Sequence, residues 1–310
     1  MDYKKIIFLL FTFFNLYLFA QKDENITLTT KTGNIEGTLL LPVKEKNIPI
    51  ALIIAGSGPT DRDGNNPYMK NNSLKMLATG LLENGIATLR YDKRGIANSK
   101  DAALKESDLR FENYIDDAEQ WIALLKKDKR FNKIIVIGHS EGSLIGMIAS
   151  QKVKVDKFIS IAGVGRPAAV VIADQLKSQS TELIEISQPI IDKLNKGETV
   201  EDVPQMLFSI FRPSVQPYII SWFKYDPQIE IKKLQIPVLI VQGTTDIQVT
   251  TEDAELLKKA NSKVKLEIIE GMNHIMKESE IDRQKNIQTY SLPDLPLKVG
   301  LVDVLVEFIY

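Results

Sequence analysis

Residues 134–143 read IIVIGHSEGS, and the stretch continues with the apolar residues 144–149. The β-branched run at its start predicts a buried strand, and the apolar run after it predicts a helix. A serine on a tight turn between them needs a strained backbone, which glycines at positions 138 and 142 permit because larger side chains there would collide. This layout is typical of a nucleophile elbow, so Ser140 is the candidate nucleophile.

A serine hydroxyl is a weak nucleophile and requires a general base. The chain contains only two histidines, His139 and His274. His139 adjoins Ser140 on the turn, where neighbouring side chains point in different directions. His274 lies in a glycine-containing loop after the alternating strand at residues 264–269, from which it could reach across the strand ends. A lone histidine is more often a surface or core residue, but scarcity and position favour His274 as the base.

The acid that orients this base should follow another core strand. Residues 236–242 predict such a strand, and a Gly-Thr-Thr turn then leads to Asp246. An aspartate at this point could instead cap the next helix. The order Ser140, Asp246, His274 along the chain is that of α/β-hydrolases and differs from the orders in chymotrypsin and subtilisin. Asp246 is therefore the candidate third member of a triad.

Acyl transfer also requires hydrogen-bond donors for the developing oxyanion. We expect one donor to be the backbone amide of Glu141, directly after the nucleophile at the start of a helix. We expect the second at Ser57, in the Gly-Ser-Gly loop that follows the apolar strand at residues 49–54. Glycines on both sides of Ser57 let the backbone approach a substrate, although such a stretch can also be a simple turn.

Together these motifs resemble the serine α/β-hydrolases of bacterial carboxylesterase type, whose outline dienelactone-hydrolase-like and serine-aminopeptidase-like members share. The resemblance spans most of the chain and rests on the Gly-Ser-Gly-Pro loop with Asp-Arg-Asp after it, RYDKRGIANS at residues 90–99, the elbow, QGTTD at residues 242–246, and His274. It implies an α/β-hydrolase fold and acyl-hydrolase chemistry. Ala55 stands where these relatives often have histidine, which leaves the backbone donors of the loop available.

Two charged motifs are better explained by structure than by ligand binding. Residues 61–66, DRDGNN, resemble the start of a calcium loop, but Asn72 stands at the twelfth position where a bidentate glutamate is needed. We predict a turn there. Residues 92–94, Asp-Lys-Arg, could bind phosphate, yet charges at a strand end followed by glycine are more often ion-paired loop anchors.

The remainder of the chain predicts an α/β fold with an insertion. Residues 26–41 alternate like an antiparallel hairpin, and strands and helices then alternate, which favours a mostly parallel central sheet flanked by helices. After residue 163 this alternation stops for about seventy residues, whereas the median connection between elements has ~4–6 residues. Helical periodicity at residues 168–194 and 199–211 predicts a helical cap. We expect the core at residues 21–165 and 229–310, with the cap at 166–228.

The cap is also where the acyl pocket is expected, because it offers loose apolar surface near the strand ends. The candidate pocket residues are Met206, Phe208, Phe211, Trp222 and Phe223. The alternative is that these side chains form the core of the cap itself.

The N-terminus predicts export. Lys4 and Lys5 precede an apolar stretch at residues 6–20 that ends in Ala20 before Gln21, as in a cleavable signal peptide of residues 1–20. The mature protein should then be periplasmic or secreted. Retention of the segment as an uncleaved anchor is the alternative, although the stretch is shorter than the roughly 20 residues that span a bilayer comfortably.

The amino-acid composition excludes several kinds of chemistry and of binding partner. The formal net charge is −1 and no cysteine is present, which excludes disulfides and thiol catalysis. No basic stripe with interleaved aromatic residues occurs, so a nucleic-acid partner is not expected. Serine-based chemistry requires neither a metal nor another cofactor.

The sequence therefore predicts a serine hydrolase that cleaves small-molecule carboxylic esters through an acyl-enzyme. An aminopeptidase, or a thioesterase or acyltransferase, on the same fold is the alternative. An aminopeptidase would need cap carboxylates for the substrate amine, for which Glu182 and Glu185 are available. A non-catalytic binding protein is the alternative from a different class. The acyl group, the leaving group and the oligomeric state stay open at this point.

Overall fold

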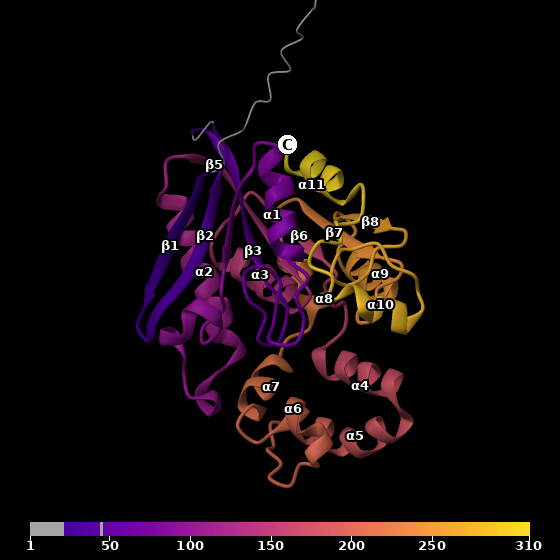
Figure 1. The fold of residues 1–310 in the computed structure, drawn as a ribbon. Coiled ribbons are helices and arrows are strands. Elements are labelled where there is room, and N and C mark those ends of the chain that lie inside the picture. The colour runs from indigo at the N-terminus through magenta and orange to yellow at the C-terminus, as the bar shows by residue number, and fades with distance from the viewer. Residues whose placement is uncertain (1–21, 44–45) are drawn as a thin grey trace, which may run out of the picture.

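The computed structural model describes residues 22–43 and 46–310, and the predicted signal peptide at residues 1–20 lies outside the described residues. The described residues form an eight-stranded central sheet in the order β1-β2-β4-β3-β5-β6-β7-β8 (Figure 1). The strands are β1 (Lys22–Thr30), β2 (Gly33–Leu41), β3 (Ile48–Ile54), β4 (Ala87–Tyr91), β5 (Phe131–His139), β6 (Lys157–Ile161), β7 (Val238–Gly243) and β8 (Lys265–Ile269).

The sheet is parallel from β4 to β8 and antiparallel at its first two strands. The hairpin expected at residues 26–41 is confirmed, since Thr30 pairs with Gly33 across the turn between β1 and β2. Chain order reverses around β3, which lies between β4 and β5. The carboxyl ends of β3 and β5 therefore meet at a topological switch point, where open α/β sheets bind ligands.

Side chains of β3 alternate between two hydrophobic clusters, as the two-residue period of a strand requires. Ile50, Leu52 and Ile54 belong to one cluster, and Ala51 and Ile53 belong to the other. The first face of the sheet is covered by α2 (Phe111–Lys127), α3 (Glu141–Lys152) and α9 (Thr251–Ala260), and the second by α1 (Ser73–Glu83) and α11 (Leu301–Ile309). The sheet is thus buried on both faces.

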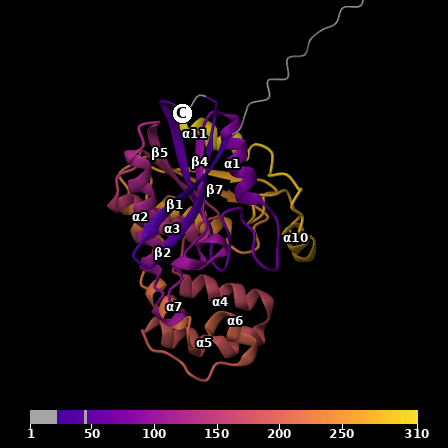
Figure 2. The same cartoon turned by 60° about the vertical axis from the view of Figure 1, so that its left-hand side comes forward.

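A second group of helices lies at one end of the sheet, and the C-terminus lies at the other end in both views (Figures 1 and 2). We call α4 to α7 the cap. They are α4 (Ala168–Gln179), α5 (Thr181–Asn195), α6 (Phe208–Phe211) and α7 (Gln216–Trp222). They fall within the segment for which a helical cap was expected. The chain returns to β7 through α8 (Pro227–Lys233), and α10 (Arg283–Thr289) follows β8.

Two details of the expected cap helices are wrong. Residues 168–194 form two helices because Ser180 is extended, with φ −163°, and its side chain caps α5 by accepting a hydrogen bond from the backbone N–H of Glu182. Residues 199–211 are helical only from Gln205 onward, in the 3₁₀ turn Gln205–Leu207 and in α6. Pro204 stands just before that turn, and a proline disfavours helix in the residue that precedes it.

The cap is joined to the core at both of its ends. Arg166, before α4, donates to Asp253 of α9, with Nε 2.9 Å from Oδ1. At the other end, Trp222 of α7 stacks on Phe111 at the start of α2, with ring centroids 6.0 Å apart. Across the part of the chain that the structure describes, no helix has both the length and the apolar character needed to cross a bilayer.

Candidate active site

Ser140 lies between β5 and α3 in a backbone conformation that residues other than glycine rarely adopt, with φ 54° and ψ −123°. The glycines on either side have no room for a side chain. A Cβ on Gly138 would lie 2.3 Å from the Gly142 carbonyl oxygen, and a Cβ on Gly142 would lie 2.4 Å from the Ile54 carbonyl oxygen. The strained backbone at Ser140 is held by this close packing of the turn against β3.

His274 and Asp246 are hydrogen-bonded to each other, with Nδ1 2.8 Å from Oδ2. Both side chains are almost fully buried. The carboxylate also accepts hydrogen bonds from the backbone N–H groups of Gln248 (2.8 Å) and Val249 (3.0 Å) and from Nε2 of Gln242 (3.0 Å). Burial opposes ionisation of Asp246, but His274 and the two backbone hydrogen bonds outweigh it and hold the pKa of the carboxyl below its usual value. An ionised Asp246 fixes the tautomer of His274 that carries its proton on Nδ1.

His139 connects the elbow to the loop of His274. Its Nε2 lies 2.8 Å from the backbone carbonyl oxygen of His274, to which it donates, and the two rings lie 4.9 Å apart. Burial, together with the nearby His274, lowers the pKa of His139 to about 4, so the ring is neutral at pH 7. The sequence indicated only that His139 is a poor candidate for the base, and its contact with the backbone of His274 was not predicted.

The Gly-Ser-Gly loop after β3 lies against the elbow. A Cβ on Gly56 would be 3.1 Å from Cβ of Ser140, so the two segments are in contact. Ser57 is exposed beside this contact. Glu141 is the first residue of α3, and the first N–H groups of a helix have no partner within the helix. The two backbone amides expected to bind an oxyanion are therefore on segments that meet at Ser140.

The two charged motifs have the structural roles expected of them, with one exception. The carboxylate of Asp61 accepts hydrogen bonds from the backbone N–H groups two and four residues later, which closes a turn. Asp92 pairs with Arg62, and Arg94 pairs with Asp117 of α2. Lys93 is different, because its ammonium bonds to the backbone carbonyl of Gly56.

The five residues expected to line an acyl pocket lie in different environments. Phe211 and Phe223 are buried in the larger hydrophobic cluster, and Trp222 packs against it from α7. Met206 and Phe208 are 58% and 47% exposed. Three of the five residues therefore contribute to hydrophobic packing, whereas Met206 and Phe208 are accessible from solvent.

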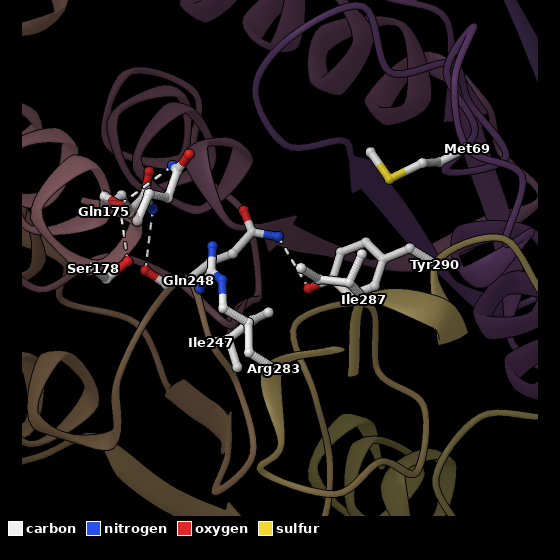
Figure 3. A pocket seen from close by; sticks show the side chains of 9 residues that line it. Met69, Gln175, Ser178, Ile247, Gln248, Arg283, Ile287 and Tyr290 are labelled. Carbon is white, nitrogen blue, oxygen red and sulfur yellow. Dashed lines mark hydrogen bonds between the residues drawn. The ribbon is translucent and has the colours of Figure 1, made fainter. Parts of the chain in front are cut away.

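A cavity of about 260 Å³ opens between the cap and the turn that carries Asp246 (Figure 3). One face of α4 lines one side of it, and a face of α10 lines the other. Its polar lining includes Gln175, Gln179, Gln248, Arg283 and Tyr290. Figure 3 shows the Gln248 amide directed at Tyr290, to whose hydroxyl oxygen it donates at 3.0 Å.

Helix α10 is bonded to both loops that carry the acid and the base. Nδ2 of Asn286 donates to the Thr245 carbonyl at 2.7 Å, and Nδ2 of Asn273 donates to Oγ1 of Thr289 at 2.8 Å. Asn273 precedes His274 and Thr245 precedes Asp246. Helix α10, which lines the cavity, is therefore hydrogen-bonded to the residues that directly precede Asp246 and His274. As for metals, residues 22–43 and 46–310 include no group of three or more His, Cys, Asp or Glu side chains placed to hold an ion.

Comparison with known proteins finds one family model and one curated relative that match much of this chain. Residues 70–197 match the family described as Serine aminopeptidase, S33. The chain is 30% identical over 265 residues to Esterase EstD of Thermotoga maritima, a match that covers 83% of this chain and 60% of that protein. The chain thus spans about 60% of the length of this curated relative.

Solved structures show the same fold at low sequence identity. Est1E from Butyrivibrio proteoclasticus, in a structure with ferulic acid bound, has a TM-score of 0.61 at 18% identity over 92% of this chain and 96% of that one. The α/β hydrolase GrgF from Penicillium sp. sh18 has a TM-score of 0.61 at 17% identity over 93% and 98% of the two chains. By its sheet, its elbow and these structural neighbours, the chain has the α/β-hydrolase fold.

Proposed function

We propose that this protein is a serine hydrolase that cleaves small-molecule carboxylic esters through an acyl-enzyme. The observation that carries the proposal is the 2.8 Å hydrogen bond between His274 and Asp246, with the loop of His274 bonded to the elbow through His139. The name of the relative from Thermotoga maritima, an esterase, supports the same reaction.

The proposed reaction has two halves. Oγ of Ser140 attacks the ester carbonyl while Nε2 of His274 takes its proton, and the backbone N–H groups of Glu141 and Ser57 stabilise the oxyanion. The intermediate collapses, and the alcohol leaves with the proton from His274. Water, deprotonated by His274, then attacks the acyl-enzyme and releases the acid and free Ser140. Asp246 stabilises the imidazolium formed in each half.

Ester substrates fit the described residues better than peptides with a free N-terminus. An aminopeptidase must bind a substrate ammonium, and the two cap carboxylates considered for this role, Glu182 and Glu185, are exposed on α5. The cavity beside Asp246 presents amides, a phenol and a guanidinium, which suit hydrogen-bond acceptors better than a cation.

The test compares p-nitrophenyl esters of graded acyl length with amino-acid p-nitroanilides. We expect ester turnover, and we expect Ser140→Ala, His274→Ala and Asp246→Asn each to lower kcat by about 10³-fold or more while the fold persists. A fluorophosphonate should label the wild type and leave Ser140→Ala unlabelled. A folded Ser140→Ala variant with wild-type ester turnover would refute the proposal, and faster turnover of anilides than of esters would favour the aminopeptidase.

A further inference from the structure

Lys93 is a buried lysine whose ammonium bonds to the loop beside the nucleophile. It follows β4, is 1% exposed, and its Nζ donates to the Gly56 carbonyl oxygen at 2.5 Å. The same ammonium lies 5.1 Å from the ring centre of Tyr114 on α2. Burial lowers the pKa of Lys93, and the charge of Glu141 opposes that shift. A buried ammonium is costly unless it is paired and hydrogen-bonded, so its placement needs an explanation.

The carbonyl that Lys93 contacts belongs to an informative peptide unit. The Gly56 carbonyl and the Ser57 N–H are the two ends of one planar trans peptide, so they point in opposite directions. A cation on the carbonyl fixes the plane of that peptide and polarises its N–H, because hydrogen bonds in a chain strengthen one another. The Ser57 N–H is the expected oxyanion donor.

Glu141 is the second buried charged residue next to the nucleophile. The residue is 2% exposed, and its Oε1 accepts a hydrogen bond from the Tyr218 hydroxyl at 2.6 Å. Its own backbone N–H is the other expected oxyanion donor. Tyr218 belongs to α7, so this hydrogen bond links the cap to the residue directly after the nucleophile.

We propose that Lys93 is a positioning residue that orients and polarises the Gly56–Ser57 peptide for oxyanion binding. Glu141 supplies the compensating charge, and Tyr218 connects this pair to the cap. The inference rests on the proposed acyl-transfer function. Because an oxyanion exists only after attack, loss of Lys93 should affect the transition state and leave ground-state binding almost unchanged.

The test is Lys93→Met, with Lys157→Met as the matched control. The Lys157 ammonium also donates to a backbone carbonyl, that of Phe308 at 2.6 Å, and also lies near a ring, 5.2 Å from the centre of Phe308. It stands at the start of β6, whereas the site lies at the carboxyl ends of the strands. We expect Lys93→Met to lower kcat on p-nitrophenyl butyrate by about tenfold or more, with KM within twofold, since removing a whole oxyanion donor costs roughly 10²–10³.

A second readout separates oxyanion binding from general damage to the protein. An aryl trifluoromethyl ketone forms a hemiketal oxyanion with the nucleophile, so its inhibition constant should rise in Lys93→Met by the same factor as kcat/KM falls. In Lys157→Met both constants should stay within twofold of wild type. A folded Lys93→Met variant with wild-type kcat, or an equal loss of kcat in both variants, would overturn the proposal.

Tyr218→Phe decides the matter if Lys93→Met does not fold. It removes only the hydroxyl that bonds to Glu141, and we expect kcat to fall by about threefold or more with unchanged KM. An unchanged kcat in that variant would overturn the proposal. Ser140→Ala, measured in parallel, distinguishes this failure from failure of the proposed function. An inactive Ser140→Ala beside a fully active Lys93→Met rejects only the role of Lys93.

Discussion

At the scale of single residues, the site depends on backbone groups as much as on side chains. Ser140 is held at positive φ by the packing of its turn, and the loop of His274 is held next to it by a hydrogen bond from His139 to a backbone carbonyl. Lys93 likewise contacts a backbone carbonyl. Side chains with backbone partners can therefore be essential to the geometry of this site without being reactants.

The buried His139 makes folding stability depend on pH. Its ordinary pKa of 6.5 applies in the unfolded chain, whereas in the folded protein the pKa is lowered to about 4. The unfolded state therefore gains a proton first as pH falls, and stability is lost between pH 6.5 and about 4, with no further loss from this residue below that range. This residue alone should cost about 2 kcal/mol of unfolding free energy between pH 8 and pH 5.

Urea unfolding of the wild type and of His139→Gln at both pH values measures this effect. The glutamine keeps a donor for the His274 carbonyl but does not titrate. The difference in unfolding free energy between pH 8 and pH 5 should be smaller in His139→Gln by that amount. Equal pH dependence in the two proteins would show that His139 is not held neutral by the fold.

At the scale of elements, local sequence patterns predicted what local physics determines. The elbow, the hairpin and the order of strands and helices follow from periodicity and from glycine positions. The break of residues 168–194 at Ser180 was not predicted. A serine that caps a helix cannot be told apart, by periodicity alone, from a serine on the polar face of one continuous helix. The contact of Lys93 was also missed, since its partner lies 37 residues earlier and is a carbonyl that every residue has.

The aromatic residues of α7 allow a test of the expected acyl pocket. We expect Trp222→Ala to lower kcat/KM on hexanoate esters about tenfold and on acetate esters much less, because a short acyl group leaves the pocket partly empty in both proteins. Phe208→Ala, on the more exposed helix α6, is measured on the same two esters for comparison. Equal losses on both esters would mean that Trp222 holds the cap on α2 through its stack with Phe111 and does not line the pocket.

The cavity between α4 and α10 makes a separate prediction. Ile287 lines it from α10, and Ile287→Trp should fill part of its volume of about 260 Å³. We expect kcat/KM to fall roughly tenfold for bulky esters and to stay near wild type for p-nitrophenyl acetate, because steric exclusion from a pocket acts on large substrates first. Ile281→Trp adds the same bulk at an exposed site that does not line the cavity. If both variants behave alike, substrate does not enter the cavity.

At the scale of the whole molecule, the cap and the core meet at the point where chemistry is expected. Two ion pairs, Arg166–Asp253 and Arg212–Glu106, join them. The hydrogen bond from Tyr218 to Glu141 joins them directly beside it. The cap therefore contacts the residue that directly follows the nucleophile, in addition to its two ion pairs with the core.

Export of the molecule is the last prediction, and it concerns the segment before the described fold. Small residues are required just before a signal-peptidase cleavage site, and Ala20 meets that requirement after the apolar stretch at residues 6–20. We expect mass spectrometry of the native protein to find Gln21 as the first residue, outside the cytoplasm. Ala20→Tyr should block cleavage and leave the longer chain with the membrane. A wild-type chain that retains residues 1–20 in the membrane fraction would show that the segment is an anchor, with the hydrolase fold attached to the membrane surface.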